Sequence, residues 1–164
     1  MLMNERIQEL INDQINYEMY SGYIYLSMAA YFESENLKEF ANWMKIQAYE
    51  ELKHAQKFFD YVNERGARVL LKSIQAPKTE WISAKEVFKE AYEHEKNVTA
   101  RIYNIADYAI ELKDHATVSF LNWYADEQVE EEANTLEILQ KLEKIGDHMQ
   151  GLFMLDSELS KREG

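Results

Sequence analysis

The sequence predicts an all-α protein: a four-helix bundle with one long crossover and a short fifth helix. Three observations support this fold. The 164 residues include only one proline and five glycines, so helix-breaking residues are rare. Apolar residues recur every three or four positions along four long segments, as on one face of a helix. One long connection, 67–82, separates the two halves of the chain and contains the proline, Pro77.

Capping and breaking residues divide the chain into five helices. We expect them at about residues 4–33, 37–65, 83–113, 115–145 and 152–161. Asn36 and Ser83 each precede a Glu by three positions, a capping-box pattern that marks a helix start. Asp114 ends one helix and caps the next, and Gly66 suits the position after a helix. The chain, 1–164, is expected to form a single domain.

The lengths of the connections predict how the helices run. Helices of about 30 residues are ~45 Å long. Tight turns at 34–36 and 114 make the first pair and the last pair antiparallel. The connection 67–82 spans about 50 Å when extended, enough to traverse the bundle. The second and third helices therefore run parallel, in an up-down-down-up order.

Composition narrows the functional classes. Eighteen Lys and Arg against thirty Asp and Glu give a net charge of −12, which argues against nucleic acid or a membrane as partner and suits a protein that binds cations. Cysteine is absent, which excludes disulfides, thiolate metal sites and cysteine nucleophiles. No segment approaches the ~20 apolar residues of a membrane span, and the start lacks the apolar run of a signal peptide. We therefore expect a cytoplasmic protein.

The most informative feature is a carboxylate near the middle of each apolar stripe. The four residues are Glu18, Glu51, Glu95 and Glu131. A buried carboxylate without a partner is so costly that it normally takes up a proton or a cation. None of the four stripes contains a Lys or Arg that could pair with these acids. Four acids that converge at similar heights in a bundle indicate a cation site.

The spacing of Glu51 and His54 is a second, independent indication. Glu-x-x-His places a carboxylate and an imidazole side by side on one helical face. Bundles that bind two iron or manganese ions use single Glu residues from two helices and Glu-x-x-His from the others. The fourth helix departs from this pattern, since Gln128 stands where Glu is usual and Glu131 where His is usual. Oxygen ligands with one imidazole favour iron or manganese, although zinc and calcium remain chemically acceptable. The other histidines are expected at the surface: His94, His115 and His148.

At these residues the sequence resembles a bacterial or archaeal non-haem ferritin. The matching segments are 12–21, 50–55, 94–95, 120–132 and 152–159. The resemblance covers essentially the whole chain and implies a ferroxidase that oxidises ferrous iron with dioxygen or hydrogen peroxide. It also implies a hollow shell of 24 identical subunits that stores ferric mineral, with the short last helix lining four-fold axes.

The same resemblance implies roles for individual residues. One iron would bind to Glu18, Glu51 and His54. The second would bind to Glu51, Glu95 and Glu131, with Gln128 beside it. A third iron site would use Glu50, Glu127 and Glu130 and share Glu131, although an ordinary solvated face explains those three acids equally well. Tyr25 and Trp123 match aromatic residues implicated in electron donation, and simple packing is the alternative for both.

The sequence lacks residues that are typical of two related families, bacterioferritins and rubrerythrins. Bacterioferritins carry a haem-binding Met at the position of Leu52, so no haem is expected. They also repeat Glu-x-x-His on the last long helix, which this chain does not. Rubrerythrins need cysteines to bind their additional iron, and cysteine is absent here.

Two other classes of function remain as alternatives. A di-iron or di-manganese oxidoreductase acting on an organic substrate would need a substrate cavity beside the metals and no shell. A structural or signalling bundle would have no reason to place acids in all four apolar stripes. Particle size and the capacity to accumulate iron separate these alternatives from iron storage.

Overall fold

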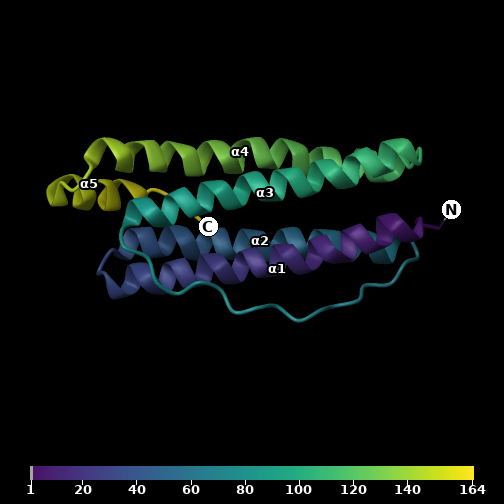
Figure 1. The fold of residues 1–164 in the computed structure, drawn as a ribbon, viewed down its shortest axis with the longest axis horizontal. Helices are drawn as coiled ribbons and strands as arrows, with labels where there is room; N and C mark the ends of the chain where they lie inside the picture. Colours follow the sequence, from purple (N-terminus) through teal and green to yellow (C-terminus); the bar gives the residue numbers. More distant parts are fainter. Residues whose placement is uncertain (1) are drawn as a thin grey trace.

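The computed structural model describes residues 2–164, which form five α-helices and no strand. The helices are α1 (Glu5–Ser34), α2 (Lys38–Glu64), α3 (Ala84–Glu111), α4 (His115–Ile145) and α5 (Met149–Leu159). Figure 1 shows α1 to α4 as long rods lying side by side, with α5 at one end of the bundle. The predicted all-α bundle with a short fifth helix is confirmed. None of the helices within 2–164 is both long and apolar enough to cross a bilayer.

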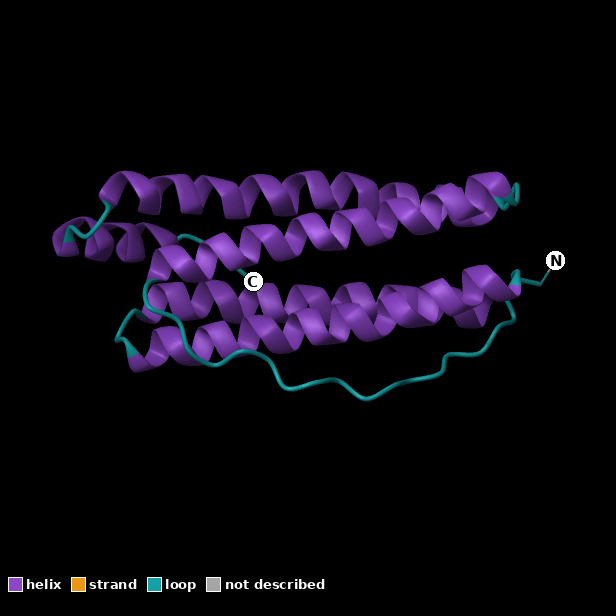
Figure 2. Ribbon diagram, viewed as in Figure 1, coloured by secondary structure: helices purple, strands orange, loops and turns teal. Residues whose placement is uncertain are grey.

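The helices run in the predicted order. α1 packs along α2 and α3 along α4, and α1 also contacts α3. The α1–α2 and α3–α4 pairs are each joined by a short turn and are antiparallel (Figure 1). The long connection between α2 and α3 follows the outside of the bundle from one end to the other (Figure 2). It therefore returns the chain to the end where α2 began, and α2 and α3 run parallel.

The start of α2 differs from the expectation. Asn36 is not the N-cap, because its backbone is left-handed, with φ of 60°, and the cap position falls on Leu37, whose side chain cannot accept a hydrogen bond. Oδ1 of Asp156 on α5 instead accepts from the backbone N–H groups of Glu39 at 3.1 Å and Phe40 at 3.0 Å. A tertiary contact thus satisfies amides that a local cap would normally satisfy, and it attaches α5 to α2.

Two other helix ends also differ from their predicted positions. α3 stops short of the expected residue because Lys113 has a left-handed φ of 56°, which an α-helix does not continue through. α5 was expected over 152–161 and instead spans Met149–Leu159. The reason is His148, whose Nδ1 accepts from the backbone N–H of Gly151 at 3.2 Å and so caps the helix before the glycine.

The apolar core consists of two clusters, one toward each end of the bundle, and each draws on all four long helices. In one cluster the rings of Phe32, Phe40 and Phe88 lie 5.0 to 6.1 Å apart. The other contains Ile11 and Phe58, both fully buried. Between the two clusters the same inward faces carry polar side chains. A polar layer therefore interrupts the core near the middle of the bundle.

Asp114 attaches the start of α4 to the end of α2. Its carboxylate accepts from the backbone N–H of Thr117 at 3.2 Å, from the Thr117 hydroxyl at 2.7 Å and from the guanidinium of Arg65 at 3.1 Å. Partial burial opposes ionisation of Asp114, but the hydrogen bonds from Thr117 and Arg65 outweigh it and lower the pKa of this carboxyl below its ordinary value. Asp114 confirms the predicted cap and adds an ion pair that the sequence did not indicate.

Replacing Asp114 with alanine is expected to destabilise the protein by about 1–2 kcal/mol at pH 7, through loss of the helix cap. Because the folded-state pKa is depressed, the stabilisation from Asp114 is present above its unfolded pKa of about 3.9 and is lost as the pH falls through the folded value. Urea unfolding at pH 7 and near pH 3 measures this difference. Asp147→Ala, at an exposed position, is the control. A deficit of equal size at both pH values would contradict the assigned contacts.

Candidate metal centre

The polar layer in the middle of the bundle is built from side chains of all four long helices. Each occupies the inward stripe of its helix, so packing of the bundle brings them together. They are Glu18 on α1, Glu51 and His54 on α2, Glu95 on α3, and Gln128 and Glu131 on α4. None of them is more than 4% exposed. The residues that the sequence singled out thus share one buried layer.

Glu18, Glu51 and His54 form a first group. Nδ1 of His54 lies 3.3 Å from Oε2 of Glu51 and 3.9 Å from Oε2 of Glu18. All three atoms are buried, and within the described part of the chain none has a hydrogen-bond partner. An unpaired buried polar atom costs about 1–3 kcal/mol. A divalent cation among two carboxylate oxygens and an imidazole nitrogen would satisfy all three, and this donor set suits iron or manganese.

Glu51, Glu95 and Glu131 form a second group, in which each acid offers an oxygen within 4.8 Å of the others. Hydrogen bonds already hold Glu95: the Tyr25 hydroxyl donates to its Oε1 at 2.5 Å, and Nε2 of Gln128 donates to its Oε2 at 3.1 Å. Glu51 belongs to both groups. The geometry therefore allows two cations side by side with Glu51 between them.

Burial and mutual repulsion determine the charges in this layer. Burial, reinforced by the charge of Glu51, raises the pKa of Glu18 and of Glu95 well above their usual range. Burial, with Glu95 and Glu51 nearby, does the same for Glu131. Burial also opposes ionisation of Glu51, but contacts with His54 and other neighbours lower the pKa of Glu51 to about 2. Burial lowers the pKa of His54, but attraction to Glu51 and the other nearby acids outweighs this effect, so the pKa of His54 is raised. Without a cation, Glu51 is thus the ionised acid, and binding a cation displaces protons from the others.

The predicted third set of acids is only partly assembled. Oε1 of Glu127 lies 3.8 Å from Nε2 of His54, and Glu127 belongs to a further group of ligand atoms with His54 and Glu131. Glu50 instead pairs with Arg162 at 3.1 Å, and Glu130 is exposed. The structure therefore brings Glu127 to the centre and leaves the other two acids outside that group.

The two aromatic residues singled out by sequence lie at different depths. Tyr25 is fully buried and donates to Glu95, and burial with the nearby carboxylates raises the pKa of its phenol. Trp123 is 41% exposed, and its ring stands edge-on to that of His54 at 5.5 Å. The ammonium group of Lys57 lies 3.5 Å from the centre of the Trp123 ring. Tyr25 is therefore part of the buried layer, and Trp123 covers it from outside.

Two glutamines that the sequence analysis did not identify also belong to this layer. Nε2 of Gln14 donates to Oε1 of Glu18 at 3.0 Å, and Nε2 of Gln47 donates to Oε1 of Glu51 at 2.9 Å. Each glutamine lies one helical turn before the acid that it contacts. The i, i+4 spacing of Gln and Glu on an inward face is the signal that could have found them.

The expectation that His94 lies at the surface is wrong. Its Nε2 lies 2.7 Å from the hydroxyl of Ser21, and its ring stacks on that of Tyr17 with centres 5.2 Å apart. Burial lowers the pKa of His94 to about 4, so the imidazole is neutral at physiological pH. The α1–α3 contact partly covers this residue, and periodicity within α3 alone could not reveal that contact.

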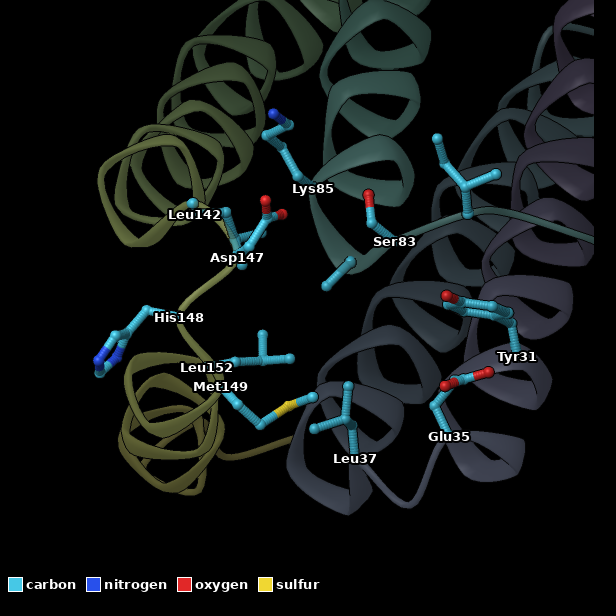
Figure 3. Close-up of a pocket in the computed structure, with 13 residues that line it drawn as sticks. Tyr31, Glu35, Leu37, Ser83, Lys85, Leu142, Asp147, His148, Met149 and Leu152 are labelled. Atoms are coloured by element: carbon cyan, nitrogen blue, oxygen red, sulfur yellow. The ribbon is translucent and has the colours of Figure 1, made fainter.

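One cavity, of about 450 Å³, opens at the end of the bundle, far along the helices from the acidic layer. Figure 3 shows Tyr31, Lys85, Asp147 and His148 around it, at the junction of α1, α3 and the α4–α5 connection. The acidic layer does not line this cavity, and its side chains are almost fully buried.

Comparison with known proteins places this arrangement among ferritins. A sequence model of the ferritin-like domain matches residues 8–145. The bacterial non-heme ferritin of Staphylococcus aureus (strain MRSA252) is 41% identical over 161 residues, covering 98% of this chain and 97% of the relative. The corresponding protein of Staphylococcus saprophyticus is 42% identical over 161 residues, covering 98% and 96%. An open-pore ferritin from the hyperthermophilic archaeon Archaeoglobus fulgidus superimposes with a TM-score of 0.97 at 52% identity, covering 98% of this chain and 99% of that one.

Proposed function

The chain belongs to the ferritin family, whose function is iron storage, and we propose that it oxidises ferrous iron at the buried centre and stores ferric mineral in a hollow shell of 24 subunits. Iron is both substrate and cargo in this proposal, with two ions in each ferroxidase centre. Each ferrous ion loses one electron. The pair reduces dioxygen to hydrogen peroxide, or hydrogen peroxide to water, with uptake of two protons. We also propose a cytoplasmic location.

The observation that carries this function is the set of unpaired buried atoms on Glu18, Glu51 and His54. Buried acids at this density are tolerated only with protons or cations. Carboxylate oxygens are hard donors that favour the ferric over the ferrous ion, and therefore promote oxidation. Glu18, Glu51 and His54 would bind the first ion. Glu51, Glu95 and Glu131 would bind the second, with Gln128 beside it as a weaker, neutral neighbour.

Tyr25 and the outer acids complete the proposed site. The Tyr25 hydroxyl would hold Glu95 in place for the second ion and act as an electron donor beside the centre. The hydrogen bond from Tyr25 to Glu95 supports the first of these roles. Glu127, Glu50 and Glu130 would hold a third ion on its way to the interior, sharing Glu131. The distance of 3.8 Å between Oε1 of Glu127 and Nε2 of His54 supports the part assigned to Glu127.

An oxidoreductase that acts on an organic substrate is a weaker explanation. Such an enzyme needs a cavity beside its metals, whereas the ligands here are almost fully buried. Haem is not part of the proposal, because Leu52 occupies the position that provides the haem ligand in bacterioferritins.

Exposed apolar side chains support assembly into a shell. On α5 these are Met149, Phe153 and Met154, which are 55% to 68% exposed. On α1 and α2 they include Tyr23 and Tyr49. Apolar side chains exposed together on one short helix, as on α5, are typical of contacts between subunits.

Iron loading together with particle mass tests the proposal. Purified protein is expected to elute far above the 19.5 kDa of one chain and to accumulate many irons per subunit when ferrous iron and air are supplied. Glu18→Ala combined with Glu51→Ala is expected to slow the initial oxidation at least about a hundredfold, because both proposed sites lose ligands. Glu9→Ala combined with Glu137→Ala removes two exposed acids and is the matched control.

Each part of the proposal has its own contrary outcome. Equal oxidation rates in the wild type and the Glu18/Glu51 variant would remove the catalytic assignment. Oxidation without retention of iron beyond a few ions per subunit would remove storage. Elution at the size of a single chain would remove the shell.

A further inference from the structure

Two similar hydrogen bonds, each from a glutamine amide, hold carboxylates of the metal centre. Gln14 and Gln47 each lie one turn before a centre acid, on α1 and α2, and donate to Glu18 and Glu51. Nε2 of Gln47 donates in addition to Oε2 of Glu131 at 2.5 Å. Gln47 therefore touches two of the acids that would bind the second ion.

Each of these glutamines is in turn bound by an arginine. Nε of Arg101 donates to Oε1 of Gln14 at 3.0 Å, and Nη2 of Arg162 donates to Oε1 of Gln47 at 2.9 Å. A primary amide can present either its oxygen or its NH₂ group to a neighbour, whereas a guanidinium can only donate. The arginine therefore keeps the amide oxygen on its own side and directs the NH₂ group at the carboxylate.

Arg162 reaches this position from the segment that follows α5. Its guanidinium lies 4.2 Å from the centre of the Trp43 ring and donates to the Trp43 carbonyl at 3.4 Å and to Oε2 of Glu50 at 3.1 Å. Gly164 lies against Ile46, so this segment follows α2. The side chain of Arg162 is 18% exposed. Stacking and hydrogen bonds thus hold the guanidinium against α2.

We propose that Arg162 is a positioning residue for the second iron, acting through Gln47 on Glu51 and Glu131. This inference rests on the proposed function, because it assumes that these acids bind an ion. The effect is selective. Gln47 contacts two members of the second group, Glu51 and Glu131, but only one member of the first group, Glu51. Loss of Arg162 frees the Gln47 amide to rotate and loosens the second ligand set more than the first.

Stepwise binding of Co²⁺ without oxygen tests this role. The probe is Co²⁺ alone, followed by calorimetry and by its visible absorption bands. Arg162→Gln is expected to weaken the second binding step about tenfold, as is typical when an outer contact to a metal ligand is removed. The first step is expected to change by less than about twofold. Lys161→Gln removes the same charge from the exposed neighbouring residue and should leave both steps unchanged.

A double-mutant cycle tests the path through Gln47. In a Gln47→Met background, Arg162→Gln should weaken the second step by less than about twofold, because its target is gone. A full additional loss in that background would overturn the proposal, since Arg162 would then act by another route such as Glu50. Equal weakening of both steps by Arg162→Gln, or of neither, would also overturn it. If the wild type does not bind two Co²⁺ ions, the proposed function itself is overturned. If the wild type binds two Co²⁺ ions and Arg162→Gln changes neither binding step, only the role of Arg162 is overturned.

Discussion

Replacing Glu51 with glutamine is expected to lower the initial rate of ferrous iron oxidation at least about a hundredfold, equivalent to about 2.7 kcal/mol of activation free energy. Glu51 is the acid that belongs to both ligand groups, and the low pKa conferred by its neighbours makes it the ionised member of the layer. A glutamine has nearly the same shape but is neutral, so it cannot bridge two cations with two anionic oxygens. Stopped-flow absorbance after mixing with ferrous iron and air measures the rate.

The same variant separates chemistry from folding. Glutamine preserves the packing of the layer, so circular dichroism and particle mass are expected to match the wild type. Glu137→Gln, at an exposed position of α4, is the control and should oxidise iron at the wild-type rate. If Glu51→Gln kept its rate within about twofold of the wild type, the bridging role would be wrong.

Replacing Glu18 with glutamine is expected to stabilise chelator-treated protein, increasingly so as the pH rises. The pKa of Glu18 is raised in the folded state by burial and by the charge of Glu51. Its unfolded pKa is about 4.3. The contribution of this carboxyl to stability is therefore fully present below that value and is lost as the pH rises toward the folded pKa, by about 1.4 kcal/mol per pH unit.

Thermal unfolding at fixed subunit concentration measures this effect. The variant and the wild type should be nearly equal at about pH 4.5, whereas at pH 7 the variant should be the more stable, with a difference that grows by at most about 1.4 kcal/mol per pH unit in between. Glu9→Gln, on the exposed side of α1, should show no such trend. Adding Co²⁺ should reverse the order, because the wild type has the ligand and the variant does not. A difference that does not depend on pH would mean that Glu18 is not held protonated by burial.

The residues of the acidic layer were accessible to sequence reasoning because they violate a local rule. Glu18 and Glu95 stand on stripes that are otherwise apolar, and such a violation is visible without knowledge of neighbouring helices. The burial of His94 could not be predicted, because it does not violate any such local rule. Its stripe gave no indication of burial, and the cover comes from Tyr17 and Ser21 on α1.

Helix ends with a local cap could be predicted from the sequence, whereas those with a distant or unusual cap could not. Ser83 and Asp114 cap the helices that follow them, since each interacts with an amide three residues away. The cap of α2 could not be predicted, because Asp156 supplies it from far along the chain. The start of α5 was misplaced because a histidine, His148, is an unusual cap.

The sequence by itself determined the all-α class, the order of the helices, and the acids that would meet in the middle of the bundle. These properties follow from periodicity, connection length and charge, which are read along one chain segment at a time. Only the tertiary structure decided which atoms of those acids are left unpaired, and which side chains hold the rest. Gln47 meets Glu131, and Arg162 meets Gln47, only because segments distant in sequence pack together, and hydrogen bonds across such contacts have no period that a sequence can show.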